Sequence, residues 1–131
     1  MNWLFGVADA IMHRMLIIEI VSDVVCPWCF IGTRRLETAV AMVRSQVPDF
    51  SYQKRWLPFF LNPDTPPEGE PYLPFLEHKF GSRAAVDALF GRIREAGRAY
   101  GIEYAFEKIE LRANTLRAHR LIHWAQQRGT A

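Results

Sequence analysis

Long apolar runs are absent from this sequence. No stretch of about 18 apolar residues occurs, which excludes a membrane-spanning helix. Positive and negative charges nearly balance, and the net charge of +2 over 131 residues is too small to indicate nucleic-acid binding through a basic surface. No internal repeat or low-complexity segment occurs either. With half of its residues apolar, the chain has the composition of an ordinary globular fold of one domain, or of one domain and part of a second.

The first 14 residues lack the features of a signal peptide. They have no basic segment at the start, Asp9 interrupts the apolar run, and no small-residue cleavage site follows. We therefore interpret residues 1–14 as an upstream start or a short appended helix, and we expect a cytoplasmic protein. A structural disulfide is not expected in that reducing compartment.

Cysteine is scarce, because the chain contains only Cys26 and Cys29. Both lie in one short turn, in the segment SDVVCPWCFIG, and they form a C-x-x-C pair. Three interpretations are available: a redox pair, half of a metal site, or two small buried hydrophobic side chains. The expected cytoplasmic location favours redox chemistry or metal binding over a structural role.

The first half of the chain predicts a βαβ unit. Residues 16–21 are apolar apart from Glu19, which predicts a strand buried on both faces in the middle of a sheet. Between Leu36 and Val47 apolar residues recur at helical spacing, which predicts an amphipathic helix that ends near Pro48. Residues 50–57 alternate polar with apolar, so they predict a half-exposed strand near a sheet edge. The long crossover makes the two strands parallel.

The second half predicts an irregular loop followed only by helices. Six of the eight prolines lie in residues 57–74, which excludes a regular element across that segment. A short helix over residues 72–80 would stop at Gly81, and a second would be capped by Ser82 and run to Gly101. A third helix would begin near Asn114 and be capped by Gly129; one of its faces carries Ala118, Leu121, Ile122 and Ala125.

The C-x-x-C pair falls where the predicted buried strand passes into a helix. A helix N-terminus offers unpaired N–H groups and a partial positive charge, and both stabilise a thiolate. We therefore predict that Cys26, at the helix start, is the more exposed and more acidic thiol, and that Cys29 is the buried resolving thiol. Pro27 suits the first helical position. Trp28 would present a flat apolar surface to a peptide-like substrate.

A zinc site is the alternative use of these thiols. His119 and His123 are four residues apart on one predicted helix and point the same way. Together with the two cysteines they make a suitable set of ligands for tetrahedral zinc. About ninety residues separate the two halves, far more than in a zinc finger. We therefore expect no metal, and we expect one of the histidines to face solvent or to cap a buried polar group.

Three segments, SDVVCPWCFIG, WLPFFLNPDTPPEG and NTLRAHRLIHWA, resemble the DsbA-like thiol oxidoreductases of the FrnE branch. These are relatives of the 2-hydroxychromene-2-carboxylate isomerases and the kappa-class glutathione transferases. The resemblance runs over about residues 16–125. It implies an α/β thioredoxin-like fold with an N-terminal extension at residues 1–14, a βαβ portion at residues 15–62, and an all-helical insertion at residues 63–131.

The chain departs from this family in two respects. Family members continue past the insertion with two antiparallel strands, a final helix and a cis-proline loop that faces the cysteines. Pro58 is too early to be that proline, so we interpret the sequence as the N-terminal portion of a longer protein, with the second half of the thioredoxin domain missing. Phe60 stands where the family would have a charged residue, and no carboxylate role is expected there.

The thiol chemistry and the resemblance together predict a thiol–disulfide oxidoreductase. The catalytic residues would be Cys26 and Cys29, with Pro27 and Trp28 binding substrate. No metal or organic cofactor is expected; glutathione is an option as co-substrate, and the partners would be protein or small-molecule thiols and disulfides. Two alternatives stay open: a glutathione-dependent isomerase or transferase, and a truncated, non-catalytic binding module. A strand in the middle of a sheet has a neighbour on each side, and only one neighbour is predicted for residues 16–21. Its second apolar edge would therefore be exposed, so a homodimer also stays open.

Overall fold

The computed structural model describes residues 15–130, and its first half is the predicted βαβ unit. Strand β1 (Leu16–Ser22) leads into helix α1 (Pro27–Gln46), and the chain returns through strand β2 (Tyr52–Pro58). The two strands pair in parallel along their whole length, with Leu16 opposite Tyr52. Side chains along β2 alternate between half-buried and exposed over most of its length, which confirms the predicted half-exposed strand.

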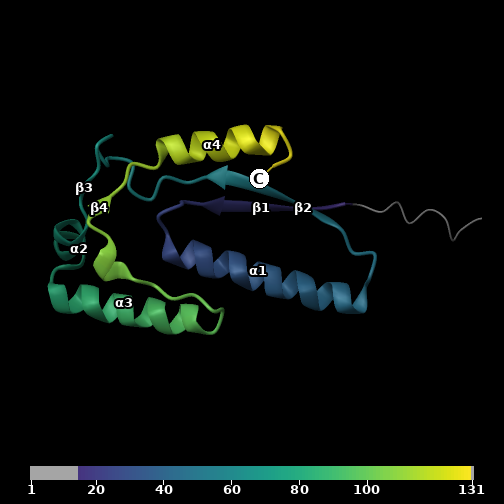
Figure 1. Cartoon of the computed structure of the whole chain (residues 1–131), viewed down its shortest axis with the longest axis horizontal. Helices are drawn as coiled ribbons and strands as arrows, with labels where there is room; N and C mark the ends of the chain where they lie inside the picture. Colours follow the sequence, from purple (N-terminus) through teal and green to yellow (C-terminus); the bar gives the residue numbers. More distant parts are fainter. Residues whose placement is uncertain (1–14, 131) are drawn as a thin grey trace, which may run out of the picture.

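Helices cover both faces of this two-stranded sheet. Figure 1 shows α1 on one side of the strands and α4 (Leu116–Gln127) on the other. Gln126 ties α4 to β2, because its side-chain oxygen accepts from the backbone N–H of Trp56 at 2.6 Å and its amide donates to the Trp56 carbonyl at 3.0 Å. Helix α4 therefore packs on β2.

Strand β1 is much more exposed than its sequence suggested. Leu16, Ile17 and Val21 are 47%, 48% and 61% exposed, so the prediction of a strand buried on both faces is wrong. Within residues 15–130, β2 is the one strand that pairs with β1, and the opposite edge of β1 makes no ladder there. An apolar sequence makes burial of a strand favourable, but the strand is buried only where other elements cover it. The described residues supply no strand on the second side of β1.

Helix α1 buries only part of its apolar stripe. Ile31 and Val40 are 1% and 7% exposed, but Val43 and Val47 are 39% and 51% exposed. The predicted apolar stripe is therefore only partly used. Towards its C-terminal end, α1 has neither the helical region nor a wider sheet to pack against (Figure 1).

The densest packing lies in the helical region formed by α2 (Tyr72–Phe80), α3 (Arg83–Arg98) and the 3-10 turn η1 (Phe106–Lys108). Gly81 ends α2 with a φ of 90°, and the Ser82 hydroxyl caps α3 by accepting from Ala85 N–H at 3.2 Å, both as predicted. The fully or nearly fully buried apolar side chains of this core are Leu76, Val86, Phe90, Ile93, Ile102 and Phe106, joined by Ile31 from α1.

The second half of the chain is not entirely helical. Strands β3 (Glu70–Pro71) and β4 (Leu111–Arg112) form a short antiparallel ladder, so the prediction of an all-helical insertion is wrong in this detail. An ion pair between Glu70 and the buried Arg112 links the same two strands. The partners are 42 residues apart, and no local pattern indicates such pairing. The boundary at residue 62 is not tested by these contacts and stays a prediction.

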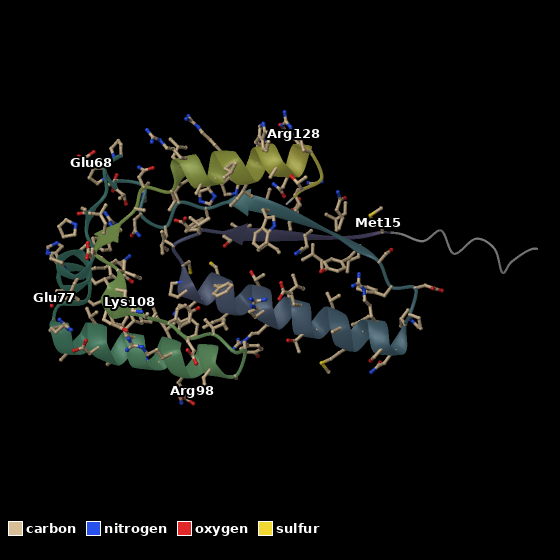
Figure 2. All side chains as sticks on the ribbon, in the orientation of Figure 1. Met15, Glu68, Glu77, Arg98, Lys108 and Arg128 are labelled. Atoms are coloured by element: carbon tan, nitrogen blue, oxygen red, sulfur yellow. The ribbon has the colours of Figure 1, made fainter. Side chains whose placement is uncertain are left out.

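The surface carries most of the charge. Arg98 and Arg128 point away from the molecule on opposite sides (Figure 2), and both are exposed.

The packed face of α4 differs from the predicted apolar face at one residue. Leu121, predicted on that face, is 64% exposed, and the packed face consists of His119 and the half-buried Ala118, Ile122 and Ala125. Among residues 15–130, no helix is long and apolar enough to cross a membrane.

Candidate active site at the start of helix α1

Cys26 occupies the N-cap position of α1. Its backbone is extended, and its sulfur accepts from the backbone N–H of Cys29 at 3.4 Å. The backbone N–H of Cys26 donates to the carbonyl of Asp23 at 3.1 Å, which closes the turn between strand and helix. Pro27 is the first helical residue, as predicted, because this position needs no N–H donor. The two thiols are thereby held one helical turn apart.

The two cysteines are free thiols, and both are half-buried, so the predicted contrast in exposure does not appear. Burial raises the pKa of Cys26, and its side-chain hydrogen bond to Cys29 raises it further. Burial also acts to raise the pKa of Cys29. That effect is outweighed by hydrogen bonds from the side chains of Cys26 and Ser22 and from the Asp23 backbone, so the pKa of Cys29 lies below its ordinary value.

The predicted order of acidity stays a prediction, because two neighbouring thiols lose their first proton as a pair. Burial and the neighbouring Cys29 act against a charged Cys26, whereas hydrogen bonding favours a charged Cys29. Both effects oppose the influence of the helix N-terminus, from which the order was predicted. Neither effect is visible in the spacing of the motif.

Cys26 lies between two pockets. The first has a volume of about 400 Å³ and is bordered by both cysteines, the end of β2 and His119 from α4. The second has a volume of about 630 Å³ and is bordered by Cys26, Pro27 and Trp28 together with apolar side chains of the helical region. Trp28 is 46% exposed and borders the same pocket as Cys26; its role in binding substrate stays a prediction.

Tyr104 joins the helical region to this turn. Its hydroxyl donates to the Pro27 carbonyl at 2.7 Å, and its ring stacks on Phe106 at 5.0 Å. Burial raises the pKa of Tyr104, and the nearby Cys26 raises it further. Gly97 leaves room for the ring, because a Cβ there would lie 2.8 Å from Tyr104 Cε2. Sequence reasoning missed Tyr104, since 77 residues separate it from Pro27.

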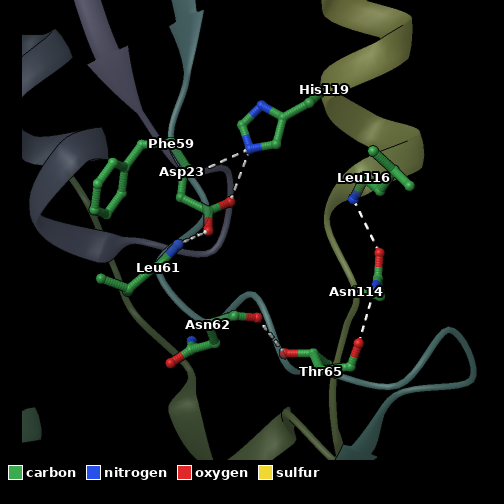
Figure 3. A network of polar contacts seen from close by, with 8 residues as sticks. All are labelled: Asp23, Phe59, Leu61, Asn62, Thr65, Asn114, Leu116 and His119. Atoms are coloured by element: carbon green, nitrogen blue, oxygen red, sulfur yellow. Dashed lines mark hydrogen bonds and ion pairs between the residues drawn. The ribbon is translucent and has the colours of Figure 1, made fainter.

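Sequence reasoning also missed Asp23, a buried carboxylate that directly follows β1. It is 2% exposed, and its Oδ2 accepts from the Leu61 N–H at 2.8 Å. Its Oδ1 lies 3.1 Å from Nε2 of His119, and the same nitrogen lies 3.1 Å from the Phe59 carbonyl oxygen (Figure 3). Both neighbours are acceptors, so Nε2 carries the hydrogen and donates. An acidic residue between an apolar strand and C-x-x-C was the available signal.

A second polar contact links α4 to the loop that follows β2. The Asn114 amide donates to the Thr65 carbonyl at 2.7 Å, and its oxygen accepts from Leu116 N–H at 3.0 Å at the start of α4 (Figure 3). The Thr65 hydroxyl donates to the Asn62 carbonyl at 2.8 Å. The proline-rich segment is therefore an ordered loop that connects the end of β2 with α4.

The two histidines of α4 have different environments. His119 is 8% exposed and caps buried polar groups, as expected, and Phe60 contacts its ring edge-on at 5.0 Å. His123 is exposed, and its Nε2 lies 3.1 Å from the side-chain nitrogen of Gln127. Both border the first pocket together with the cysteines. Nevertheless, no group of three or more His, Cys, Asp or Glu side chains in residues 15–130 is arranged to hold a metal ion.

Comparisons with known proteins agree with this geometry. Residues 17–131 match the family model described as the DSBA-like thioredoxin domain. Among solved structures, the chain is similar to the crystal structure of a probable DsbA oxidoreductase from Streptomyces coelicolor, with 30% sequence identity and a TM-score of 0.73. That match covers 87% of this chain and 48% of the other, so this chain spans about half the length of that protein. No curated protein matches the chain.

Proposed function

Because the chain belongs to the DSBA-like thioredoxin domain family, we propose that it is a thiol–disulfide oxidoreductase acting through Cys26 and Cys29. One observation carries this proposal: both cysteines lie at the N-terminus of α1 beside an open pocket, and the Cys26 sulfur accepts from the backbone N–H of Cys29. A helix N-terminus supports the thiolate that such chemistry needs. Within the family, the three quoted segments favour the FrnE branch.

The proposed reaction exchanges one disulfide for another. The Cys26 thiolate attacks a sulfur of the substrate disulfide, forms a mixed disulfide and expels the first substrate thiolate, which takes up a proton. Cys29 then loses its proton and attacks the Cys26 sulfur. This step forms the Cys26–Cys29 disulfide and releases the second substrate thiolate. The substrate gains two electrons, and two thiols such as glutathione return the cysteine pair to its reduced state while they are oxidised to their own disulfide. The same steps in reverse oxidise a dithiol.

We assign the attack to Cys26 because it borders both pockets, whereas Cys29 borders only the first. The lower pKa of Cys29 is compatible with this assignment, since two coupled thiols lose their first proton as a pair. Movement of the remaining proton from Cys26 to Cys29 places the negative charge on Cys26. There the Cys29 N–H already donates to the sulfur, so the attacking thiolate is stabilised.

The second pocket suits the apolar part of a substrate. Trp28 lies on its border with Cys26, and Phe75 and Phe80 border it from α2. A protein or small-molecule disulfide with an apolar neighbouring group would fill this space while its sulfur reaches Cys26. We propose no metal or organic cofactor for this reaction, and we propose that it takes place in the cytoplasm.

The order of the two cysteines can be tested with single substitutions. The reduced chain is mixed with oxidised glutathione, and the products are identified by mass spectrometry. Cys29→Ser should accumulate one glutathione on Cys26, whereas Cys26→Ser should form the mixed disulfide much more slowly and reduce no protein disulfide. The Cys26→Ser/Cys29→Ser double variant gives the background.

Two outcomes would contradict the proposal. Reduction of an insulin-type disulfide by Cys26→Ser at the unsubstituted rate would exclude the dithiol mechanism. A glutathione-dependent isomerisation that survives in Cys29→Ser would favour the isomerase or transferase alternative, because that chemistry needs one thiol at most.

A further inference from the structure

Asp23 places a carboxylate next to the thiol pair in a position that water hardly reaches. It is 2% exposed, its carbonyl accepts from the Cys26 N–H at 3.1 Å, and its negative charge acts to raise the pKa of Cys29. A buried carboxylate is costly unless its oxygens are hydrogen-bonded. One oxygen accepts from Leu61 N–H at 2.8 Å and the other lies 3.1 Å from His119 Nε2. His119 is therefore its side-chain partner.

His119 reaches this carboxylate from α4, 96 residues further along the chain. Its side chain is 7% exposed, and its Nε2–H is shared between Asp23 and the Phe59 carbonyl. Phe60 covers the ring edge-on. Solvent therefore screens this contact poorly, and the hydrogen bond acts at close range in a low-dielectric environment.

We propose that His119 is a positioning residue for the thiol pair: its Nε2–H holds the Asp23 carboxylate and weakens the effect of that negative charge on the neighbouring sulfurs. His119 borders the first pocket but reaches the thiols through Asp23. The proposal rests on the proposed function only for its biological meaning, because the effect is measured on the reduced chain without any substrate.

Other titratable groups also surround the thiols. His123 borders the same pocket and is exposed, and Tyr104 faces Cys26 from the helical region. Neither forms a hydrogen bond with Asp23 among the contacts of the described residues. Asp23 and His119 are the buried pair, so substitutions at these two positions separate their contribution from that of the other groups.

The test measures the alkylation rate of each cysteine against pH, resolved by peptide mass spectrometry on the full reduced chain. In the unsubstituted chain, the rate at Cys29 should rise at a lower pH than in an unfolded thiol, and the rate at Cys26 at a higher pH. His119→Leu should move the Cys29 midpoint upward by about one pH unit. Asp23→Asn should move it downward, and adding His119→Leu to Asp23→Asn should cause no further shift.

Several variants keep the test decisive. His119→Gln retains an N–H donor, so its Cys29 midpoint should stay close to that of the unsubstituted chain. His78→Gln, at an exposed position on α2, should leave both midpoints unchanged. A folded His119→Leu chain with an unchanged Cys29 midpoint would overturn the proposal. So would an equal shift in the Asp23→Asn background, which a merely structural role of His119 would produce. If His119→Leu does not fold, Asp23→Asn decides the question. A Cys29 midpoint in Asp23→Asn that is no lower than in the unsubstituted chain would then overturn the proposal.

Discussion

The helical region and the sheet layer of this protein bury their apolar residues very differently. In the helical region Val86, Ile93 and Phe106 are 0%, 3% and 4% exposed. In the sheet layer Ile17 and Val21 of β1 are 48% and 61% exposed, although their side chains are just as apolar. Since stabilisation follows the apolar area removed from water, most of it comes from the helical region. The two cysteines lie at the end of the less well-packed layer.

The two regions meet at the cysteine turn. Ile31, two residues after Cys29, belongs to the core of the helical region, and the Tyr104 hydroxyl donates to Pro27. The start of α1 is therefore held by the better-packed region, while its far end has little contact with that region (Figure 1). A strand-to-helix turn carrying reactive groups needs this support, because the two strands alone would not fix it.

The largest difference between the regions should appear on truncating a phenylalanine in each. Phe90 is 7% exposed and stacks on Phe106 at 4.2 Å, so Phe90→Ala should lower the free energy of unfolding by about 3–5 kcal/mol. Phe59 follows β2 and is 51% exposed, so Phe59→Ala should cost about 1 kcal/mol or less. Urea denaturation measures both, and equal losses would contradict the contrast between the regions.

A second effect concerns association through the open edge of β1. An exposed apolar strand edge favours pairing between copies, so the chain should self-associate as its concentration rises. Ile17→Lys should reduce this association several-fold, as measured by light scattering, because a charged side chain on an edge strand opposes pairing. Gln53→Lys is the matched control, since Gln53 is exposed and lies opposite Ile17 in the paired strand. Association that persists unchanged in Ile17→Lys would show that another surface is used.

A smaller effect is expected where the regions join. Tyr104→Phe removes the hydroxyl that donates to Pro27 but keeps the ring, and should lower the free energy of unfolding by about 1 kcal/mol. Tyr100→Phe removes a hydroxyl from another half-buried tyrosine of the same region and should have less effect. If the two variants unfold at the same urea concentration, the contact to Pro27 contributes nothing measurable to the joining of the regions.

Local signals in the sequence predicted local structure well. The alternation along β2, the glycine that ends α2 and the serine that caps α3 each depend on residues within a few positions. The C-x-x-C motif likewise located the candidate site at the helix start. These features need no knowledge of distant residues.

Features that depend on distant partners were missed or misread. The burial of β1 depends on strands beside it, and its apolar sequence could not show how many there are. The pairs Asp23–His119 and Glu70–Arg112 join residues 96 and 42 positions apart. The pKa of each thiol depends on burial and on the side chains around it. A single sequence without aligned relatives contains no direct signal for such contacts.

Gln126 has a consequence for how this sheet can grow. Its side-chain amide satisfies both backbone groups of Trp56, as a neighbouring strand would, so an arriving strand would have to displace it. At Trp56 the outer edge of β2 is therefore already hydrogen-bonded, whereas the outer edge of β1 makes no ladder within residues 15–130. Pairing of two copies through β1 would occupy this edge in both of them. Association through β1 should consequently stop at a closed pair instead of continuing into a fibre.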